Sequence, residues 1–198
     1  MNKKSHIAFF DFDGTITSKD SMIEFVKFAH GEVKFYKGII LLSPILLALK
    51  LNLINNQTAK EKFIYHFFKH LNKQEIDNLS MRFLASLDKM ILANALEKIK
   101  WHKQNNHKVV IVSASIESYL KKWCQKHQLH LISTKLEFKN QMLTGKFATN
   151  NCYGIEKVNR IKEEYDLDAF KNIYVYGNSK GDREMLSLGT HKFYKYFN

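Results

Sequence analysis

The side chains at positions 11 and 13 are those in this sequence best suited to chemistry. Asp11 and Asp13 follow the apolar run 7–10, which predicts a short buried strand, and Gly14 and Thr15 come next. Residues i and i+2 of an extended chain point the same way, so the two carboxylates share a side if the strand persists that far. Like charges this close require a cation or a proton near them, which predicts a metal site or acid–base chemistry.

The loop that follows the two aspartates is suited to binding an anion. Gly14 lets the backbone turn closely around a ligand, and the N–H groups of Gly14 and Thr15 can meet a phosphate. A calcium loop is the first alternative. It needs glycine at position six and glutamate at position twelve, but counting from Asp11 the glycine comes at position four and Met22 at position twelve. A plain turn is the second alternative, although a turn rarely needs two acids directly after so apolar a strand.

The composition indicates a globular protein without a flexible linker. The chain has 198 residues with 45% hydrophobic content, enough for a core and one domain with an insert, and Pro44 is its single proline. A net charge of +12 attracts phosphates, nucleic acid or an anionic membrane surface. The lysines, for example Lys60, Lys62 and Lys69, are scattered at helical spacing and no nucleic-acid motif accompanies them, so we do not expect nucleic acid as a partner.

The cysteines and the first residues indicate the compartment. Cys124 and Cys152 lie apart without CxxC spacing, which favours the reduced cytoplasm over a disulfide scaffold or a zinc site. The apolar run before Asp11 has four residues, too short for a secretory signal. We therefore expect a cytoplasmic protein.

Residues 17–93 show helical patterning almost throughout, and their segment 38–49 contains no charge. Twelve residues are too few to span a bilayer, which takes about twenty. One interpretation is a buried helix of a small helical domain. The other is a membrane-contacting hairpin flanked by Lys34, Lys37 and Lys50, which would place the protein at the periphery of an anionic membrane.

After residue 93 the pattern alternates between strands and helices. The predicted elements are a strand over 108–112, a helix over 116–125, a strand over 130–134, a β-hairpin over 136–147, a helix over 155–165, a strand over 173–176 and a helix over 183–188. Such units imply a parallel α/β sheet with its site at the carboxyl ends of the strands. The predicted domains are a core of residues 1–16 and 94–198 and a helical cap of residues 17–93.

Further polar residues fall at the predicted ends of these elements, where they can share one crevice with the two aspartates. They are Ser113, Lys157, Asn178 and Asp182. One carboxylate can attack phosphorus, a second can act as general acid and base, and a hydroxyl and a lysine can hold phosphoryl oxygens. Ser113 alone could be a helix cap, but Ser115 is better placed for that role.

Four ordered segments resemble the motifs of the haloacid dehalogenase (HAD) superfamily. They are residues 11–17 (DFDGTIT), residues 110–113 (VIVS), Lys157 and residues 177–182 (GNSKGD). The helical insert between the first two is similar to the subfamily that includes phosphoserine phosphatase and phosphatidylglycerophosphatase C. The resemblance implies an α/β fold: a Rossmann-like parallel sheet with an all-helical cap inserted after the first strand and a small β-hairpin.

The resemblance also implies roles for individual residues. Asp11 would be the nucleophile that forms an aspartyl-phosphate, and Asp13 the acid that protonates the leaving oxygen and then activates water. Phosphate or substrate binding would fall to Gly14, Thr15, Asp20, Ser113, Ala114 and Lys157. Mg²⁺ would be held by Asp11, Asp13 through its backbone carbonyl, Asn178 and Asp182. Asp20 lies near where phosphoserine phosphatases present a glutamate to the substrate amine, and a helix cap is its alternative role.

One residue departs from the superfamily pattern. Asn178 stands where the family usually has an acid that binds the metal, and its amide oxygen brings no charge. We expect weaker Mg²⁺ binding, with Asp182 compensating directly or through water. The implied function is a Mg²⁺-dependent phosphomonoesterase acting on a small phosphorylated metabolite. The alternatives are a lipid phosphate phosphatase at the membrane surface and a catalytically weak phosphate-binding protein.

Overall fold

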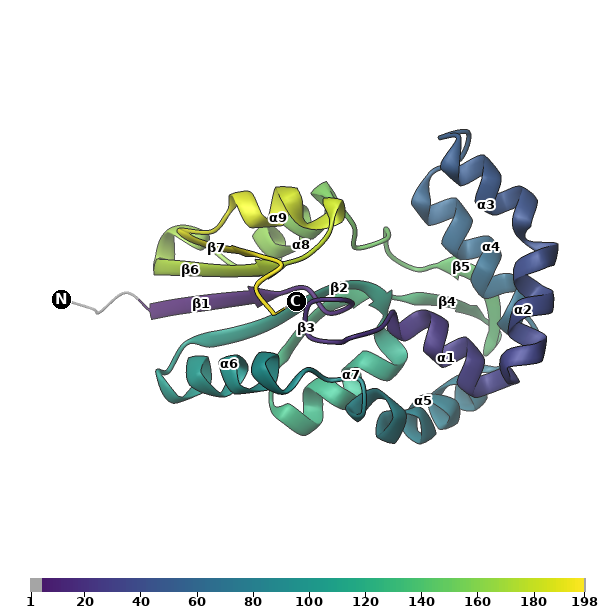
Figure 1. Cartoon of the computed structure of the whole chain (residues 1–198), viewed down its shortest axis with the longest axis horizontal. Helices are drawn as coiled ribbons and strands as arrows, with labels where there is room; N and C mark the ends of the chain where they lie inside the picture. Colours follow the sequence, from purple (N-terminus) through teal and green to yellow (C-terminus); the bar gives the residue numbers. More distant parts are fainter. Residues whose placement is uncertain (1–4, 198) are drawn as a thin grey trace.

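The computed structural model of the chain describes residues 5–197. It shows a central sheet with helices on both faces (Figure 1). The helices within residues 21–88 lie at one end of the sheet, and we refer to them as the helical layer. The strands are β1 (Ser5–Phe10), β2 (Lys108–Ile116), β3 (His130–Thr134), β4 (Leu136–Lys139), β5 (Met142–Phe147), β6 (Phe170–Gly177) and β7 (His191–Tyr194). The helices are α1 (Ser21–His30), α2 (Glu32–Leu41), α3 (Ser43–Lys50), α4 (Asn56–Phe68), α5 (Lys73–Asp88), α6 (Ala93–Gln104), α7 (Glu117–His127), α8 (Ile155–Glu164) and α9 (Arg183–Ser187), with short 3-10 turns η1 (Leu167–Ala169) and η2 (Lys180–Asp182).

The main sheet is parallel, as predicted. Its strand order is β3-β2-β1-β6-β7, and each neighbouring pair is parallel. The apolar residues of β1 do not alternate with polar ones because both of its faces are covered. Ile7 and Phe9 pack with Ile161 of α8 on one face, while Ala8 and Phe10 belong to the larger cluster on the other. The central position of β1 places its carboxyl end, where Asp11 follows, between β2 and β6.

The small antiparallel hairpin formed by β4 and β5 lies against the helical layer. The N–H of Leu143 donates to the carbonyl of Leu71 (3.1 Å), and the N–H of Phe147 donates to Oε1 of Glu61 (3.1 Å). The domain division predicted from the sequence assigns this hairpin to the core. In the structure the hairpin contacts α4 and the start of α5. The division into residues 1–16 and 94–198 and residues 17–93 stays a prediction.

The uncharged segment 38–49 is not a buried helix, so that interpretation is wrong. The chain forms two helices there, α2 and α3, and none of the residues of α3 is buried. The buried residues of α2 are Phe35 and Gly38. The ring of Phe67 from α4 packs directly on Gly38, where a side chain would leave no room for it. Ile40 and Leu41 point the other way, and their exposed fractions are 71% and 70%. Within residues 5–197, no helix has the length and apolarity needed to cross a membrane.

A buried histidine links α6 to the sheet and predicts a pH-dependent stability. His102 is fully buried, with Nε2 2.9 Å from the hydroxyl of Tyr176 and Nδ1 2.8 Å from Nδ1 of His107. Burial, followed by the positive charges of His107 and Lys98, lowers the pKa of His102 to about 3. The folded protein therefore keeps this ring neutral while the unfolded chain protonates it below its ordinary pKa of 6.5. The contribution of neutral His102 to the free energy of unfolding is fully present above pH 6.5. It is lost progressively as the pH falls from 6.5 towards 3.

We expect the free energy of unfolding to fall by about 2 kcal/mol between pH 7 and pH 5 because of His102. Urea denaturation at the two pH values measures the loss. His102→Gln should remove that share of the pH dependence, whereas the exposed His130→Gln should retain it. An unchanged pH dependence in His102→Gln would show that the buried ring does not control it.

Candidate active site

The loop after β1 is held at the carboxyl end of the sheet. The N–H of Asp11 donates to the carbonyl of Tyr176 in β6 (2.9 Å), which ties Asp11 to the neighbouring strand. The carbonyl of Phe12 then accepts the N–H groups of Thr15, Ile16 and Thr17 at 3.2, 2.8 and 3.1 Å. The strand ends at Phe10, so Asp11 and Asp13 belong to this tight loop rather than to an extended strand.

Gly14 and Thr15 shape the loop. Gly14 has a φ of +71°, and a Cβ there would lie 2.2 Å from Nδ2 of Asn178, so both conformation and space require glycine. The N–H of Gly14 donates to Oγ1 of Thr17 (3.2 Å), and that of Thr15 to the loop carbonyl described above. Both groups were expected to meet an anion but instead close the loop in this structure. The hydroxyl of Thr15 donates to Oδ2 of Asp11 (2.9 Å) and orients its carboxylate.

A buried lysine joins the first and last motifs. Nζ of Lys157, in the first turn of α8, lies 2.6 Å from Oδ1 of Asp11 and 2.6 Å from Oδ1 of Asp182. Its side chain is 2% exposed. Burial raises the pKa of Asp11 to about 6, with Lys157 opposing the rise and Asp182 adding to it. Burial disfavours the charged lysine, but the two carboxylates outweigh it and raise the pKa of Lys157.

Asp182 organises the loop between β6 and α9. Its Oδ2 accepts the N–H of Asn178 (3.1 Å) and both the N–H and hydroxyl of Ser179 (2.9 Å each), while Oδ1 faces Lys157. Burial raises its pKa, but Lys157 and these hydrogen bonds hold the pKa below its ordinary value. Both oxygens of Asp182 therefore serve hydrogen bonds and an ion pair, and this residue fixes the loop that presents Asn178.

Asn178 offers an oxygen atom with no partner. Its Oδ1 is buried and makes no hydrogen bond within residues 5–197. Such a buried orphan acceptor is costly unless a ligand satisfies it. Mg²⁺ prefers oxygen ligands and usually takes only one or two carboxylates from the protein. The same part of the chain holds no group of three or more His, Cys, Asp or Glu residues arranged for a metal ion. A Mg²⁺ site at this cavity would therefore combine the carboxylate of Asp11 with the amide oxygen of Asn178.

The second motif lies on an irregular stretch of β2. This strand continues past the predicted end at residue 112 to Ile116, and its register with β3 shifts between Ser113 and Ile116. Such irregularities re-aim side chains at strand ends. Oγ of Ser113 accepts the N–H of Ser115 (3.0 Å). The expectation that Ser115 caps the next helix is wrong, because the N-cap of α7 is Ile116 and has no side-chain cap.

Ser115 instead belongs to a hydrogen-bond network around Asp13. Its hydroxyl donates to Oδ2 of Asp13 (2.5 Å), while Oδ1 of Asp13 accepts the N–H of Ser21 (2.7 Å). The hydroxyl of Ser21 lies 3.0 Å from that of Tyr119. Burial and then the charge of Asp20 raise the pKa of Asp13 against these hydrogen bonds. The network fixes both oxygens of Asp13 and connects α1 to β2.

These segments surround a cavity of about 290 Å³. Its lining contains Asp11, Asp13, Asp20, Ser113, Ala114, Lys157, Asn178 and Asp182, together with Asn56, Lys60, Tyr153 and Ser179. The structure thus brings together eight of the ten predicted site residues, and the other two, Gly14 and Thr15, form the adjoining loop. Four carboxylates and two ammonium groups line the cavity, an excess of negative charge that suits a divalent cation.

Residues of the helical layer complete the cavity, among them Lys60 and Asp20. Lys60 of α4 donates from Nζ to the carbonyl of Ala114 (3.1 Å), and burial lowers its pKa against attraction from Asp13. Sequence reasoning grouped Lys60 with the scattered surface lysines, because its helical position alone cannot show which element α4 faces. Asp20 is the N-cap of α1, where its Oδ1 accepts the N–H groups of Met22 and Ile23 at 3.0 Å each. It therefore caps the helix and also lines the cavity.

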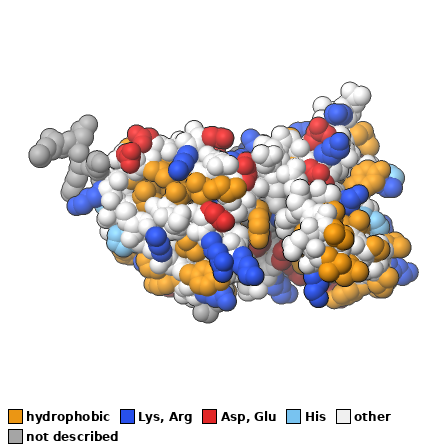
Figure 2. Space-filling model, turned by 90° about the horizontal axis from the view of Figure 1, so that it is seen from above, with side chains coloured by type: hydrophobic (Ala, Val, Ile, Leu, Met, Phe, Trp, Pro, Cys, Tyr) orange, Lys and Arg blue, Asp and Glu red, His pale blue; other side chains and the backbone are white. Residues whose placement is uncertain are grey.

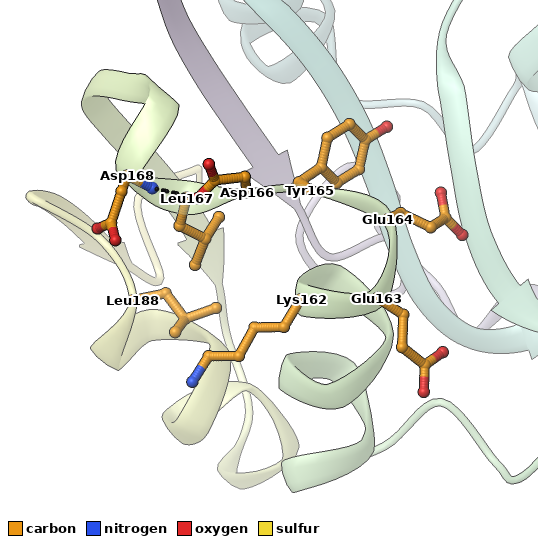
Figure 3. Close-up of a pocket in the computed structure, with 8 residues that line it drawn as sticks. All are labelled: Lys162, Glu163, Glu164, Tyr165, Asp166, Leu167, Asp168 and Leu188. Carbon is orange, nitrogen blue, oxygen red and sulfur yellow. Dashed lines mark hydrogen bonds between the residues drawn. The ribbon is translucent and has the colours of Figure 1, made fainter.

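A larger hollow elsewhere contains none of the motif residues. It has a volume of about 680 Å³ and lies at the far end of α8 (Figure 3). Lys162 extends along it towards Leu188, and the acidic side chains of Glu163 and Glu164 point outwards. Asp166 accepts the N–H of Asp168 and is engaged in a turn. Size therefore does not single out the site, whereas the convergence of the motifs does.

Known proteins resemble this chain in sequence or in fold. Protein CicA of Caulobacter vibrioides is 29% identical over 200 residues, which cover 100% of this chain and 89% of that protein. A solved protein of unknown function from Bordetella pertussis Tohama I has a TM-score of 0.83 at 18% identity, covering 95% of this chain and 88% of its own. An apo phosphoserine phosphatase has a TM-score of 0.69 at 17% identity, covering 96% and 86%.

The family comparison spans most of the chain. The model of the haloacid dehalogenase-like hydrolases matches residues 8–187, from within β1 to the end of α9. This range includes the loop after β1, the irregular stretch of β2, Lys157 and the loop after β6. With its motifs gathered around one cavity, the chain belongs to the haloacid dehalogenase-like hydrolase family.

Proposed function

We propose that the protein is a phosphomonoester hydrolase that works with Mg²⁺ through a phosphorylated Asp11. The buried pair between Asp11 and Lys157, 2.6 Å apart at the edge of the cavity, is the observation that carries this proposal. A carboxylate held between a lysine and the Thr15 hydroxyl is oriented for attack on phosphorus. A surface ion pair would give neither this burial nor this orientation.

In the first step, a carboxylate oxygen of Asp11 attacks the phosphorus of the bound ester and the ester P–O bond breaks. Asp13 supplies the proton that the departing oxygen needs, and burial favours its protonated form because it raises the pKa of Asp13. Lys157 and the polar groups at Ser113 and Ala114 face the phosphoryl oxygens, where positive charge and N–H donors stabilise the transition state.

In the second step, Asp13 takes a proton from water as that water attacks the phosphorus of the aspartyl-phosphate. The acyl phosphate P–O bond breaks, inorganic phosphate leaves and the carboxylate of Asp11 is restored. Ser21 and Ser115 hold both oxygens of Asp13 in place, so the same side chain can act in both steps without moving far.

Mg²⁺ would be held by the carboxylate of Asp11, the buried Oδ1 of Asn178 and the backbone carbonyl of Asp13. Asp182 would support the ion through the loop that it shapes, because its Oδ2 accepts the N–H groups of Asn178 and Ser179. When bound, the ion supplies positive charge against the phosphoryl oxygens and the excess of carboxylates. This assignment rests on the orphaned oxygen of Asn178 and on the cavity's charge.

The substrate that we propose is a small phosphorylated metabolite. The cavity has a volume of only about 290 Å³. In addition to the residues proposed to bind the phosphoryl group, it is lined by Asn56, Lys60 and Asp20. Lys60 favours a substrate with negative charge, whereas Asp20 favours one with a donor or a positive charge. The comparisons support the reaction class better than the substrate, because fold analogy alone does not fix a substrate.

The test of this proposal is hydrolysis of a chromogenic aryl phosphate by the purified protein, with and without Mg²⁺. We expect turnover that requires Mg²⁺, followed by selectivity in a panel of phosphorylated metabolites and lipid phosphates. Preference for a lipid phosphate would favour the alternative substrate class. Phosphate binding without turnover would favour the catalytically weak phosphate-binding protein.

A carboxylate at position 178 should tighten metal binding. We expect Asn178→Asp to lower the Mg²⁺ concentration for half-maximal activity by about tenfold or more, because even losing a supporting partner of a metal ligand costs 10 to 100-fold. Calorimetric Mg²⁺ titration gives a readout independent of activity. Asn159→Asp adds the same charge at an exposed position of α8. It should change neither the Mg²⁺ concentration for half-maximal activity nor the Mg²⁺ affinity measured by calorimetry. An unaltered metal requirement in Asn178→Asp would contradict a ligand role for residue 178.

A further inference from the structure

The helices α2 and α3 and the turn that follows α3 leave a group of aliphatic side chains open to solvent. Six such residues between positions 33 and 53 are each more than half exposed. They are Val33 (71%), Ile40 (71%), Leu41 (70%), Leu47 (57%), Leu51 (59%) and Leu53 (73%), and we refer to them as the tip surface. Scattered single residues of this kind are ordinary, but a concentration of them in one segment marks an interaction site.

The tip surface is a second apolar face and not the edge of the core. Val33, Ile40 and Leu41 are spaced i, i+7 and i+8 and so share one side of α2. The other side, with Phe35 and Gly38, is buried against Phe67 of α4. A helix on the surface of a globular protein normally turns polar residues outwards. Here the outward side is apolar, and neighbouring α3 buries none of its residues.

Every charged side chain within residues 33–53, the segment that carries the tip surface, is basic. Residues 33–60 contain no aspartate or glutamate, and the exposed Lys34, Lys37 and Lys50 lie among the aliphatic residues. The whole chain carries a net charge of +12. Figure 2 shows apolar side chains gathered over the helical end of the molecule, with basic and also acidic side chains near them. This combination fits a partner that is apolar inside and negatively charged at its surface.

We propose that the tip surface docks onto an anionic lipid bilayer, with its aliphatic side chains at the acyl boundary and its lysines at the headgroups. Helices that lie in a membrane interface combine an apolar face with basic residues in this way. A second copy of the chain fits less well, because a two-fold interface would bring Lys34, Lys37 and Lys50 of both copies close to one another. The inference goes beyond the proposed hydrolase activity and does not depend on it.

Sedimentation of the full chain with vesicles tests the proposal. We expect binding to phosphatidylcholine vesicles that contain about 30% phosphatidylglycerol, and at least tenfold weaker binding to pure phosphatidylcholine. About 0.5 M salt should weaken the binding, since it screens the lysines but not the apolar contact.

Paired substitutions separate the apolar contribution from general stickiness. Ile40→Ser/Leu41→Ser should reduce the vesicle partition coefficient at least tenfold, because two exposed aliphatic side chains can no longer leave water. The control pair Met81→Ser/Tyr194→Ser removes apolar groups that are 52% and 54% exposed elsewhere on the molecule. It should bind vesicles like the wild type, and thermal denaturation should show that both pairs are folded.

A second pair tests the lysines. Lys34→Gln/Lys37→Gln should weaken binding to the anionic vesicles about tenfold, while Lys139→Gln/Lys171→Gln, the same charge change at exposed positions on the hairpin and β6, should have a smaller effect. Equal effects of the two pairs would mean that net charge and not this surface attracts the vesicles, which would overturn the proposal.

Other results would also overturn the membrane assignment. One is the absence of sedimentation with anionic vesicles, and another is binding that Ile40→Ser/Leu41→Ser leaves unchanged. A dimer in solution that the same pair converts to a monomer would assign the tip surface to self-association. A positive readout complements these losses: Leu47→Trp should shift its fluorescence to shorter wavelength on addition of anionic vesicles, and no shift would argue against insertion.

Discussion

Asp11→Asn should lose phosphatase activity by about 10⁴-fold or more, because a side chain that acts as the covalent nucleophile has no substitute in the site. The amide cannot attack phosphorus, while its oxygen can still accept from the Thr15 hydroxyl, which lies 2.9 Å from Oδ2 in the wild type. The measurement is the initial rate of aryl phosphate hydrolysis at saturating Mg²⁺. Incubation with substrate should give a phosphorylated wild-type protein and an unmodified variant on mass spectrometry.

The fold of Asp11→Asn should be retained. The substitution removes a buried carboxylate from a cavity that already holds an excess of them, and Lys157 keeps its second partner, Asp182, at 2.6 Å. Asp77→Asn makes the same change at an exposed ion pair on α5 and should leave activity unaltered. Activity of Asp11→Asn within tenfold of wild type would contradict the nucleophile assignment.

The architecture that positions the site could be predicted because its signals are local. An apolar run followed directly by Asp11 marks a buried strand that ends at a polar loop, and repeated strand–helix units imply a parallel sheet. Polar residues after such strands must converge at one edge. The structure accordingly places Ser113, Asn178 and Asp182 around the same cavity as Asp11, although they lie more than a hundred residues from it in sequence.

The parts that could not be predicted depend on how the helical layer meets the main sheet. Ser21 and Ser115 reach Asp13 from elements far apart in sequence, and either residue alone has the pattern of an ordinary helix start or strand end. Lys60 lies at helical spacing among other lysines, and only the placement of α4 over the carbonyl of Ala114 separates it from them. Periodicity reports which side of a helix is polar, and it does not report what that side faces.

The same limit explains the error over residues 38–49. Hydropathy showed that this segment is apolar, and burial in a core is the usual fate of such a segment. Helix α2 has apolar residues on both sides, however, and the helical layer covers only the side of Phe35. The side of Ile40 stays exposed. The number of apolar residues could be read from the sequence, but the number of neighbouring elements available to cover them could not.

Lys157→Met should cost both stability and activity. The ammonium group is buried between two carboxylates at 2.6 Å each, and its removal leaves Asp11 and Asp182 as uncompensated buried charges. Breaking a buried pair in this way costs about 3–5 kcal/mol, which corresponds to a fall in Tm of roughly 10 °C for a domain of this size. Thermal denaturation measures the loss in the absence of divalent cations. Activity should fall by about 10²–10³-fold, since the charge that faces the phosphoryl oxygens is gone.

A double variant distinguishes lost charge pairing from a simple packing defect. Lys157→Met/Asp182→Asn removes one of the unpaired carboxylates and should recover part of the stability, because the cost arises from the buried charges and not from the shape of the side chain. It should not recover activity, because the ammonium group that faces the phosphoryl oxygens is still absent, and because the loop that presents Asn178 depends on Oδ2 of Asp182, which accepts the N–H groups of Asn178 and Ser179. Lys162→Met, at an exposed position of the same helix, is the matched control and should behave like the wild type. If the double variant is no more stable than Lys157→Met, the lysine contributes through packing, and its role as the electrostatic link between the first and last motifs is refuted.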